Sequence, residues 1–376
     1  MKNTIKDNTM MIHKILNALA DNLVKVFVPL LIMKKCNDIN LCVMFLVTYS
    51  LLTAILNYCL YKPMKNHPMT MIFLHIIPLC ILQFIVSLYD VINVPIVILY
   101  AILLSLGQTL YSVPSNNYFM FENKKTNAGK MSIGSNIGKF LMIIIGGFIF
   151  STTNLSYIIT ICFIATILYI FSVYPLIYIK PNYDSTLKEL TLREDTNILS
   201  KNDKILFRLY HISFGVFQAV IDTILPVFLY TNNLEFEKIA YIMAFVELVK
   251  IGMNIFAQKI KLQKLSKVSI SLAILFYIAS IPALFLVKNN LFLYILSLII
   301  NATFPLIFIP NLNKFCSKIK LSNDPQYYMT IRDVEIFSFR PILFIFMLWG
   351  NMIGCYILGI ISAIIILIVN MNKYYN

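Results

Sequence analysis

Six ionisable side chains that lie inside long apolar runs of the sequence are candidates for chemistry. A charge at the centre of a bilayer costs at least about 2.5–3.5 kcal/mol, so residues of this kind usually face a partner or a polar cavity. We therefore expect the six to mark sites of substrate binding or ion coupling. They are Asp21, Lys25, Asp222, Glu247, Lys250 and Arg340.

Four of these charges are spaced to pair along a helix. Asp21 and Lys25 are four residues apart, and Glu247 and Lys250 are three apart. Both spacings place the two side chains on one helical face. Each pair either belongs to a functional site or only neutralises itself within the packed protein, and spacing does not distinguish these readings.

Further polar groups accompany these charges. Asp222 has Gln218 one turn earlier on its own helix, and Lys139 and Arg340 are two cations deep in apolar runs. Two buried cations favour an anionic or zwitterionic ligand, although Arg340 could instead serve as the fixed partner of Asp222 or Glu247. Four amides in interior positions either line a polar cavity or form hydrogen bonds between helices: Asn57, Gln108, Gln218 and Asn254.

The composition requires that these groups be positioned by helices in lipid. Hydrophobic residues make up 59% of 376 residues and charged ones 13%, too few to cover a soluble protein of this size. Since a span needs roughly 20 apolar residues, the chain accommodates about twelve. We expect an all-α integral membrane protein with spans near 10–33, 41–61, 69–89, 95–114, 131–151, 155–179, 205–230, 237–258, 268–287, 291–310, 331–350 and 352–370.

The basic residues predict the orientation. The net charge of +14 sits in the short gaps between apolar runs, which indicates membrane topology and excludes a nucleic-acid partner. With the N-terminus inside, twenty loop lysines and arginines are cytoplasmic, and four are outside: Lys34, Lys35, Lys238 and Lys288. We expect a multi-pass protein of the plasma membrane with both termini cytoplasmic.

The longest polar stretch, Pro181 to Asp203, divides the chain. It predicts a six-helix bundle over residues 1–180, a cytoplasmic linker over 181–203 and a second six-helix bundle over 204–376. An offset of 197 residues places Pro29 on Pro226 and Asn57 on Asn254, as expected if the two bundles are pseudo-symmetric repeats.

The same offset places Lys25 on Asp222. A pseudo-twofold axis would bring this cation and anion face to face across a central cavity. We therefore expect them to form an occlusion or proton-coupling pair.

Two six-span repeats joined by a long cytoplasmic linker resemble the major facilitator superfamily over nearly the whole length. The resemblance implies an alternating-access carrier with its substrate site between the bundles. Gly138, Gly146 and Gly147 fall on the glycines of that family's exporter motif, while Met142 and Ile143 replace its central Gly-Pro. The family's basic loop after span two keeps only two of its cations, Lys62 and Lys65.

Other chemistry is not expected. The segment from Gly134 to Lys139 has one residue too few for a phosphate loop and lacks the following Ser/Thr. The histidines, His13, His67, His75 and His211, show no metal-ligand spacing, so no metal, cofactor or enzymatic activity is expected.

These observations favour a monomeric secondary active transporter in the lipid bilayer that moves a small-molecule substrate, with export (efflux) of small amphipathic compounds favoured over uptake. Two alternatives remain open: a lipid-linked glycan flippase, and a non-transporting partner or sensor that has the transporter fold.

Overall fold

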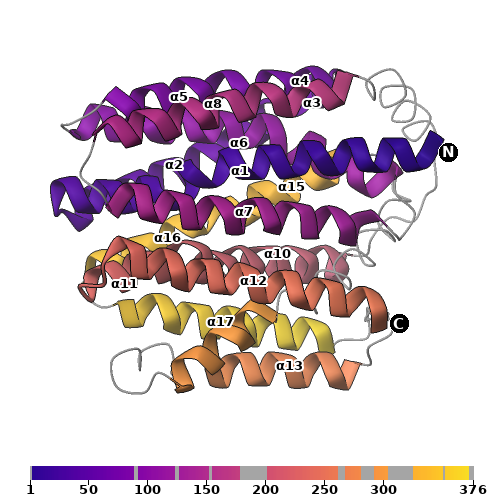
Figure 1. Ribbon diagram of the computed structural model, residues 1–376. Helices are drawn as coiled ribbons and strands as arrows, with labels where there is room; N and C mark the ends of the chain where they lie inside the picture. The colour runs from indigo at the N-terminus through magenta and orange to yellow at the C-terminus, as the bar shows by residue number, and fades with distance from the viewer. Residues whose placement is uncertain are drawn as a thin grey trace.

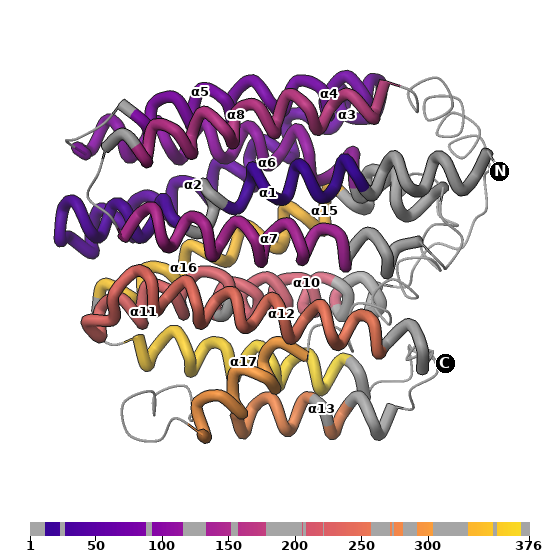
Figure 2. Tube along the Cα trace, in the orientation of Figure 1, coloured from indigo at the N-terminus to yellow at the C-terminus, as the bar shows by residue number. Residues whose placement is uncertain are grey.

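The computed structural model describes residues 2–88, 92–122, 127–151, 155–177, 201–260, 267–280, 292–303, 325–349 and 352–371. Every regular element in these ranges is a helix. The helices lie side by side along a common direction, and α1 begins at the end of the molecule where α17 finishes (Figure 1; Figure 2). Such an arrangement suits a bilayer, because helices satisfy their own backbone hydrogen bonds.

The helices before residue 178 are α1 (Lys2–Cys36), α2 (Ile39–Cys59), α3 (Tyr61–Asn66), α4 (Pro68–Leu74), α5 (Ile76–Leu88), α6 (Val94–Glu122), α7 (Asn127–Ser151) and α8 (Leu155–Ile177). Those after residue 200 are α10 (Lys201–Ala219), the π-helical turn η1 (Val220–Ile224), α11 (Leu225–Thr231), α12 (Phe236–Ile260), α13 (Lys267–Ser280), a helix over Phe292–Thr303, α15 (Pro325–Ser338), α16 (Arg340–Phe346), the 3₁₀ turn η4 (Met347–Trp349) and α17 (Met352–Met371).

Nine helices in the described ranges are long and apolar enough to span a membrane. Three expected spans are not among them. The described parts of 268–287 and 291–310 are α13 and Phe292–Thr303, and the span at 331–350 is divided between α15, α16 and η4. The count of twelve therefore stays a prediction, as does the 181–203 linker, which lies almost entirely outside the described residues.

Prolines account for the breaks inside three expected spans. Proline has no amide hydrogen and its ring clashes with the carbonyl four residues earlier, so a helix bends or ends before it. Helices α4 and α5 meet at His75, three residues before Pro78, and α15 and α16 meet just before Pro341. Pro226 follows the π-helical turn η1.

Glycines set the closest helix contacts. Helix α7 packs against α1 and α12, which together form the centre of the molecule (Figure 1). A Cβ at Gly138 would lie 2.7 Å from the Ile15 carbonyl oxygen of α1, and one at Gly147 would lie 2.0 Å from Ala240 Cβ of α12. The glycines that resemble the exporter motif thus allow α7 to approach both neighbours.

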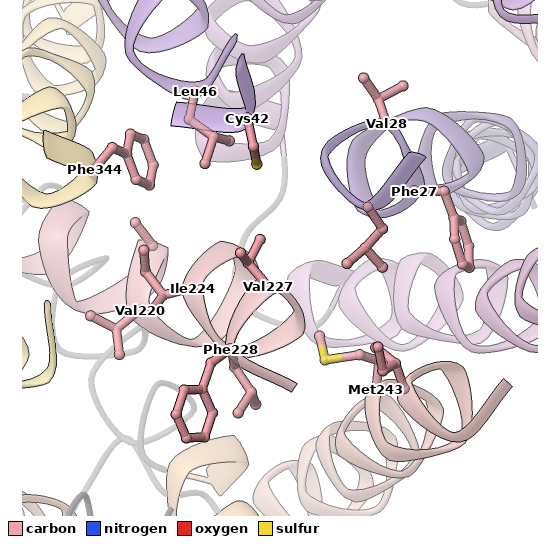
Figure 3. Close-up of a cluster of buried hydrophobic side chains, with 14 of the residues drawn as sticks. Phe27, Val28, Cys42, Leu46, Val220, Ile224, Val227, Phe228, Met243 and Phe344 are labelled. Carbon is pink, nitrogen blue, oxygen red and sulfur yellow. The ribbon is translucent and has the colours of Figure 1, made fainter. Parts of the chain in front are cut away.

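One apolar core joins elements from both ends of the sequence. Figure 3 shows Phe27 and Val28 of α1 and Cys42 and Leu46 of α2 in one buried cluster with residues of η1, α11, α12 and α16. Large apolar side chains also cover the outside; the Phe163 side chain is 65% exposed and that of Phe276 is 64%. Exposed aromatic groups on many helices indicate a surface that contacts lipid.

Candidate functional site

A charged cluster lies where η1 and α12 meet. Lys250 Nζ lies 2.7 Å from Glu247 Oε1 and 3.6 Å from Asp222 Oδ1. The side chain of Glu247 is 6% exposed and that of Lys250 15%, while that of Asp222 is 41% exposed. One ammonium group therefore bridges a buried carboxylate and a more accessible one.

The π turn at Asp222 follows from Pro226. Pro226 has no amide hydrogen to donate to the Asp222 carbonyl in the α-helical pattern. The Leu225 amide instead donates to the Val220 carbonyl, five residues back. A turn of this kind is wider than an α-helical turn and is often found at functional sites.

Arg340 extends the cluster from α16. Its Nη2 donates to Gln218 Oε1 at 3.2 Å and its Nε donates to the Gly215 carbonyl at 3.2 Å. The guanidinium also lies 4.4 Å from the centre of the Phe337 ring. Gln218 is a hydrogen-bond partner of Asp222 as well, so a continuous polar chain runs from Arg340 through Gln218, Asp222 and Lys250 to Glu247.

A glycine makes the Arg340 contact possible. A Cβ on Gly215 would lie 2.5 Å from the Ile336 carbonyl oxygen. Helices α10 and α15 can therefore approach closely enough for the start of α16 to reach the Gly215 carbonyl.

Lys139 of α7 brings a further cation to this region. It is close enough to Asp222 to interact electrostatically, as Lys250 and Arg340 are. The cluster then holds three cations, Lys139, Lys250 and Arg340, and two carboxylates. An excess positive charge among these described groups suits a ligand that carries a negative group.

The structure brings some of the expected site residues together and not others. The Glu247–Lys250 ion pair is present, and Asp222 lies beside Lys250. Asp21 accepts a hydrogen bond from Tyr169 at 3.2 Å. The Lys25 side chain lies outside the described part of the chain, so its pairing with Asp21 or with Asp222 stays a prediction.

Of the four interior amides, the structure places one in the charged cluster. Gln218 joins the charged cluster, while Gln108 is partly exposed on α6. Asn57 and Asn254 are both buried, and the Asn57 amide has no hydrogen-bond partner among the described residues. Their place in a substrate cavity stays a prediction.

Polar contacts also join α6 to α15. Ser112 Oγ donates to Asp333 Oδ2 at 2.9 Å, and Arg332 Nη2 donates to Asp333 Oδ1 at 2.6 Å. Asp333 is 4% exposed. A buried carboxylate therefore ties together two helices from opposite halves of the chain, with its two partners Ser112 and Arg332 on different helices.

A second polar centre was not anticipated from the sequence. His13 and His75, which seemed unrelated in the sequence, both lie against the ring of Tyr111, at 5.7 and 4.6 Å between ring centres. One signal was readable: His13, Asn17 and Asp21 recur at intervals of four, which places all three on one face of α1. The sequence does not indicate that His75 at the end of α4 and Tyr111 of α6 join this face, because those contacts depend on the fold.

Both the sequence and the fold are similar to those of known membrane transporters. The model of the Major Facilitator Superfamily matches residues 10–322. No curated protein sequence matches the chain. A D-xylose-proton symporter structure is similar with a TM-score of 0.67, 12% identity and 97% coverage of each chain.

Two other solved structures show the same fold. The partially occluded, inward-open xylose transporter XylE from E. coli gives a TM-score of 0.66 at 14% identity, with 96% of each chain covered. A bacterial homologue of the iron transporter ferroportin, in the outward-facing state, gives 0.64 at 11% identity, with 97% of each chain covered. The family model covers most of the sequence, and the chain therefore belongs to the Major Facilitator Superfamily, a family of membrane transporters and not of enzymes.

Proposed function

We propose that the protein is a secondary active transporter that exports small amphipathic solutes bearing an anionic or zwitterionic group. The observation that carries the proposal is the polar chain from Arg340 to Glu247, which lies among apolar side chains. Binding sites for small molecules typically combine apolar walls with a few polar groups that orient the ligand.

Alternating access between two six-span bundles, over 1–180 and 204–376, is the mechanism that we propose. Contacts between the halves support it, among them those of α1 with α11, of α2 with α15 and α16, of α6 with α15, and of α7 with α12. Asn37 and Asn233, 196 residues apart, also both adopt left-handed backbone conformations shortly after α1 and α11, with φ of 47° and 64°. This recurrence fits a chain built from two related halves.

Within this mechanism the cations of the cluster would bind the solute. Arg340 presents a planar fork suited to a carboxylate or phosphate group, and the adjacent Phe337 ring offers an apolar surface. An incoming anion would compete with Asp222 for Lys250, because the Asp222 side chain is the more exposed of its two partners. Asp222 would thereby couple solute binding to a change in the ion pair, with Asp21 and Lys25 contributing from α1.

The direction of transport rests on α7. Gly138, Gly146 and Gly147 lie where the exporter motif has its glycines and permit the close contacts of α7. We place the protein in the plasma membrane with both termini cytoplasmic, since this orientation gives the excess of basic residues inside. The flippase and the non-transporting sensor are the alternatives that transport measurements would reveal.

Flux of charged dyes in proteoliposomes tests the proposal. The wild type should transport anionic fluorescent dyes in preference to cationic dyes of similar size. Arg340→Gln and Lys250→Gln should each reduce anion flux by at least about tenfold, the effect of losing about 1.4 kcal/mol of binding. Lys238→Gln is the matched control, because that lysine is 64% exposed and pairs with an exposed Glu235.

Expression in a bacterium that lacks its major exporters tests direction. Cells carrying the wild type should survive toxic amphipathic anions better than cells carrying Asp222→Asn, with the protection depending on external pH. A strong preference for cationic dyes contradicts the proposed substrate class. Liposomes that move no solute at all favour the sensor.

A further inference from the structure

The second polar centre lies in the first half of the chain, away from the cluster around Lys250. His13, Asn17 and Asp21 come from α1, His75 from the junction of α4 and α5, Tyr111 from α6, and Tyr169 and Ser172 from α8. Both histidines and Tyr169 are fully buried, and Asn17 is 4% exposed. A polar group at such depth is stable only when its hydrogen bonds are satisfied.

The hydrogen bonds of His13 are compatible with a neutral ring. Its Nδ1 lies 2.6 Å from the Ser172 carbonyl, which can only accept, so Nδ1 carries a hydrogen. Its Nε2 lies 3.1 Å from the Tyr111 hydroxyl, which can donate to it. Every contact of this ring is therefore satisfied without a charge.

His75 has different partners. Its Nδ1 donates to the Ile72 carbonyl, which the break at the α4–α5 junction leaves near the ring. Its Nε2 lies 2.9 Å from Asn17 Oδ1, another acceptor. Two acceptors on one imidazole match the protonated ring, which has two donors.

Asn17 can serve both protonation states of His75. An amide presents an acceptor oxygen or, after turning over, a donor nitrogen. With the oxygen toward Nε2 the pair fits imidazolium, and with the nitrogen toward Nε2 it fits neutral imidazole. His75 can thus gain or lose a proton while keeping a hydrogen bond to Asn17.

A counter-charge lies on the same face of α1. Asp21 is one turn beyond Asn17, and its carboxylate accepts a hydrogen bond from Tyr169, whose ring meets the His75 ring edge-on at 6.3 Å between centres. Asp21 is partly exposed, so it connects the buried ring to a more accessible region. The titratable and charged groups around this centre are Lys14, Asp21, His13, Tyr111, Tyr169 and Cys80.

We infer that His75, Asn17 and Asp21 form a proton-binding site in the first half of the chain, whose ligand is the coupling ion of transport. The coupling role rests on the proposed function, whereas proton binding does not. Among the described residues no group of three His, Cys, Asp or Glu side chains could hold a metal, so a proton suits this centre better than a metal ion.

Infrared spectroscopy of the full-length protein in liposomes tests the site without any solute. The chain has four histidines, so replacing His67 and His211 by Gln leaves His13 and His75 alone. With ¹³C-labelled histidine, the difference spectrum between pH 8 and pH 5 should show one imidazolium per protein. His75→Gln should abolish this band, and His13→Gln should retain it.

Asn17→Leu provides a second variant should His75→Gln fail to fold. It removes the partner of Nε2 and should move the pH at which the imidazolium band appears. A band that survives His75→Gln, no band in the parent between pH 5 and pH 8, or a midpoint unchanged by Asn17→Leu would overturn the inference. Failure of dye transport would leave this spectrum intact, so the two proposals fail separately.

Discussion

Lys250 neutralises two carboxylates, and its removal tests the energetics of the charged cluster. Its Nζ lies 2.7 Å from Glu247 Oε1 and 3.6 Å from Asp222 Oδ1. At an effective dielectric constant of about 20, unit charges at these separations attract by about 6 and about 5 kcal/mol, before the desolvation cost is subtracted. Asp222 is 41% exposed and Glu247 only 6%, so solvent screens the Asp222 pair more strongly.

Lys250→Met should therefore destabilise the protein by about 3–5 kcal/mol, because it leaves Glu247 as a buried anion without its cation. Adding Glu247→Gln should recover most of the lost stability, since replacing both members of a buried ion pair by uncharged groups often changes stability little. Adding Asp222→Asn should restore little. The free energy of unfolding can be measured by SDS titration in mixed micelles.

The comparison between the two double variants is decisive. Equal recovery by Glu247→Gln and Asp222→Asn would show that burial does not distinguish the two carboxylates. A Lys250→Met variant as stable as the wild type would show that the ion pairs contribute nothing to folding. Either result refutes the reasoning.

Two further substitutions test helix packing and the helix break. Gly147→Ala should lower the yield of folded protein in size-exclusion chromatography, because the new Cβ would lie 2.0 Å from Ala240 Cβ; Gly252→Ala, with no atom within 4 Å, should be neutral or stabilising by up to about 1 kcal/mol. Pro226→Ala should raise the melting temperature but impair dye flux. The amide of the introduced alanine can donate a hydrogen bond to the Asp222 carbonyl and so replace the π turn with an α-helical turn. Normal flux with a lower melting temperature would argue against that role.

The sequence was sufficient for the class of fold and for one contact of the site. Apolar runs of span length and a basic bias predict membrane helices, because both follow from the thickness and polarity of a bilayer. The Glu247–Lys250 pair was predictable because its geometry lies within one helix. The bond from Arg340 to Gln218 was not, since it depends on how α16 packs against α10.

The histidine centre shows the same limit. His13 and His75 are 62 residues apart in the sequence, and they meet only because α1, α4 and α6 pack together around Tyr111. A search for metal-binding motifs does not identify them, since neither histidine has a second histidine at helical spacing. The periodic polar face of α1 was visible, but its partners were not.

Three polar residues of the two centres lie at helix breaks that prolines cause. Inside a membrane, a backbone carbonyl that loses its helical donor needs another partner, so polar side chains are favoured near such breaks. The His75 ring donates to the Ile72 carbonyl beside one such break. A polar residue up to four positions before a proline, inside an apolar run, is thus a sequence signal for a site, and it applies to His75 before Pro78, Asp222 before Pro226 and Arg340 before Pro341. Lys25 lies four residues before Pro29, inside the unbroken helix α1, so the same sequence signal makes it a further candidate to test beside Asp222.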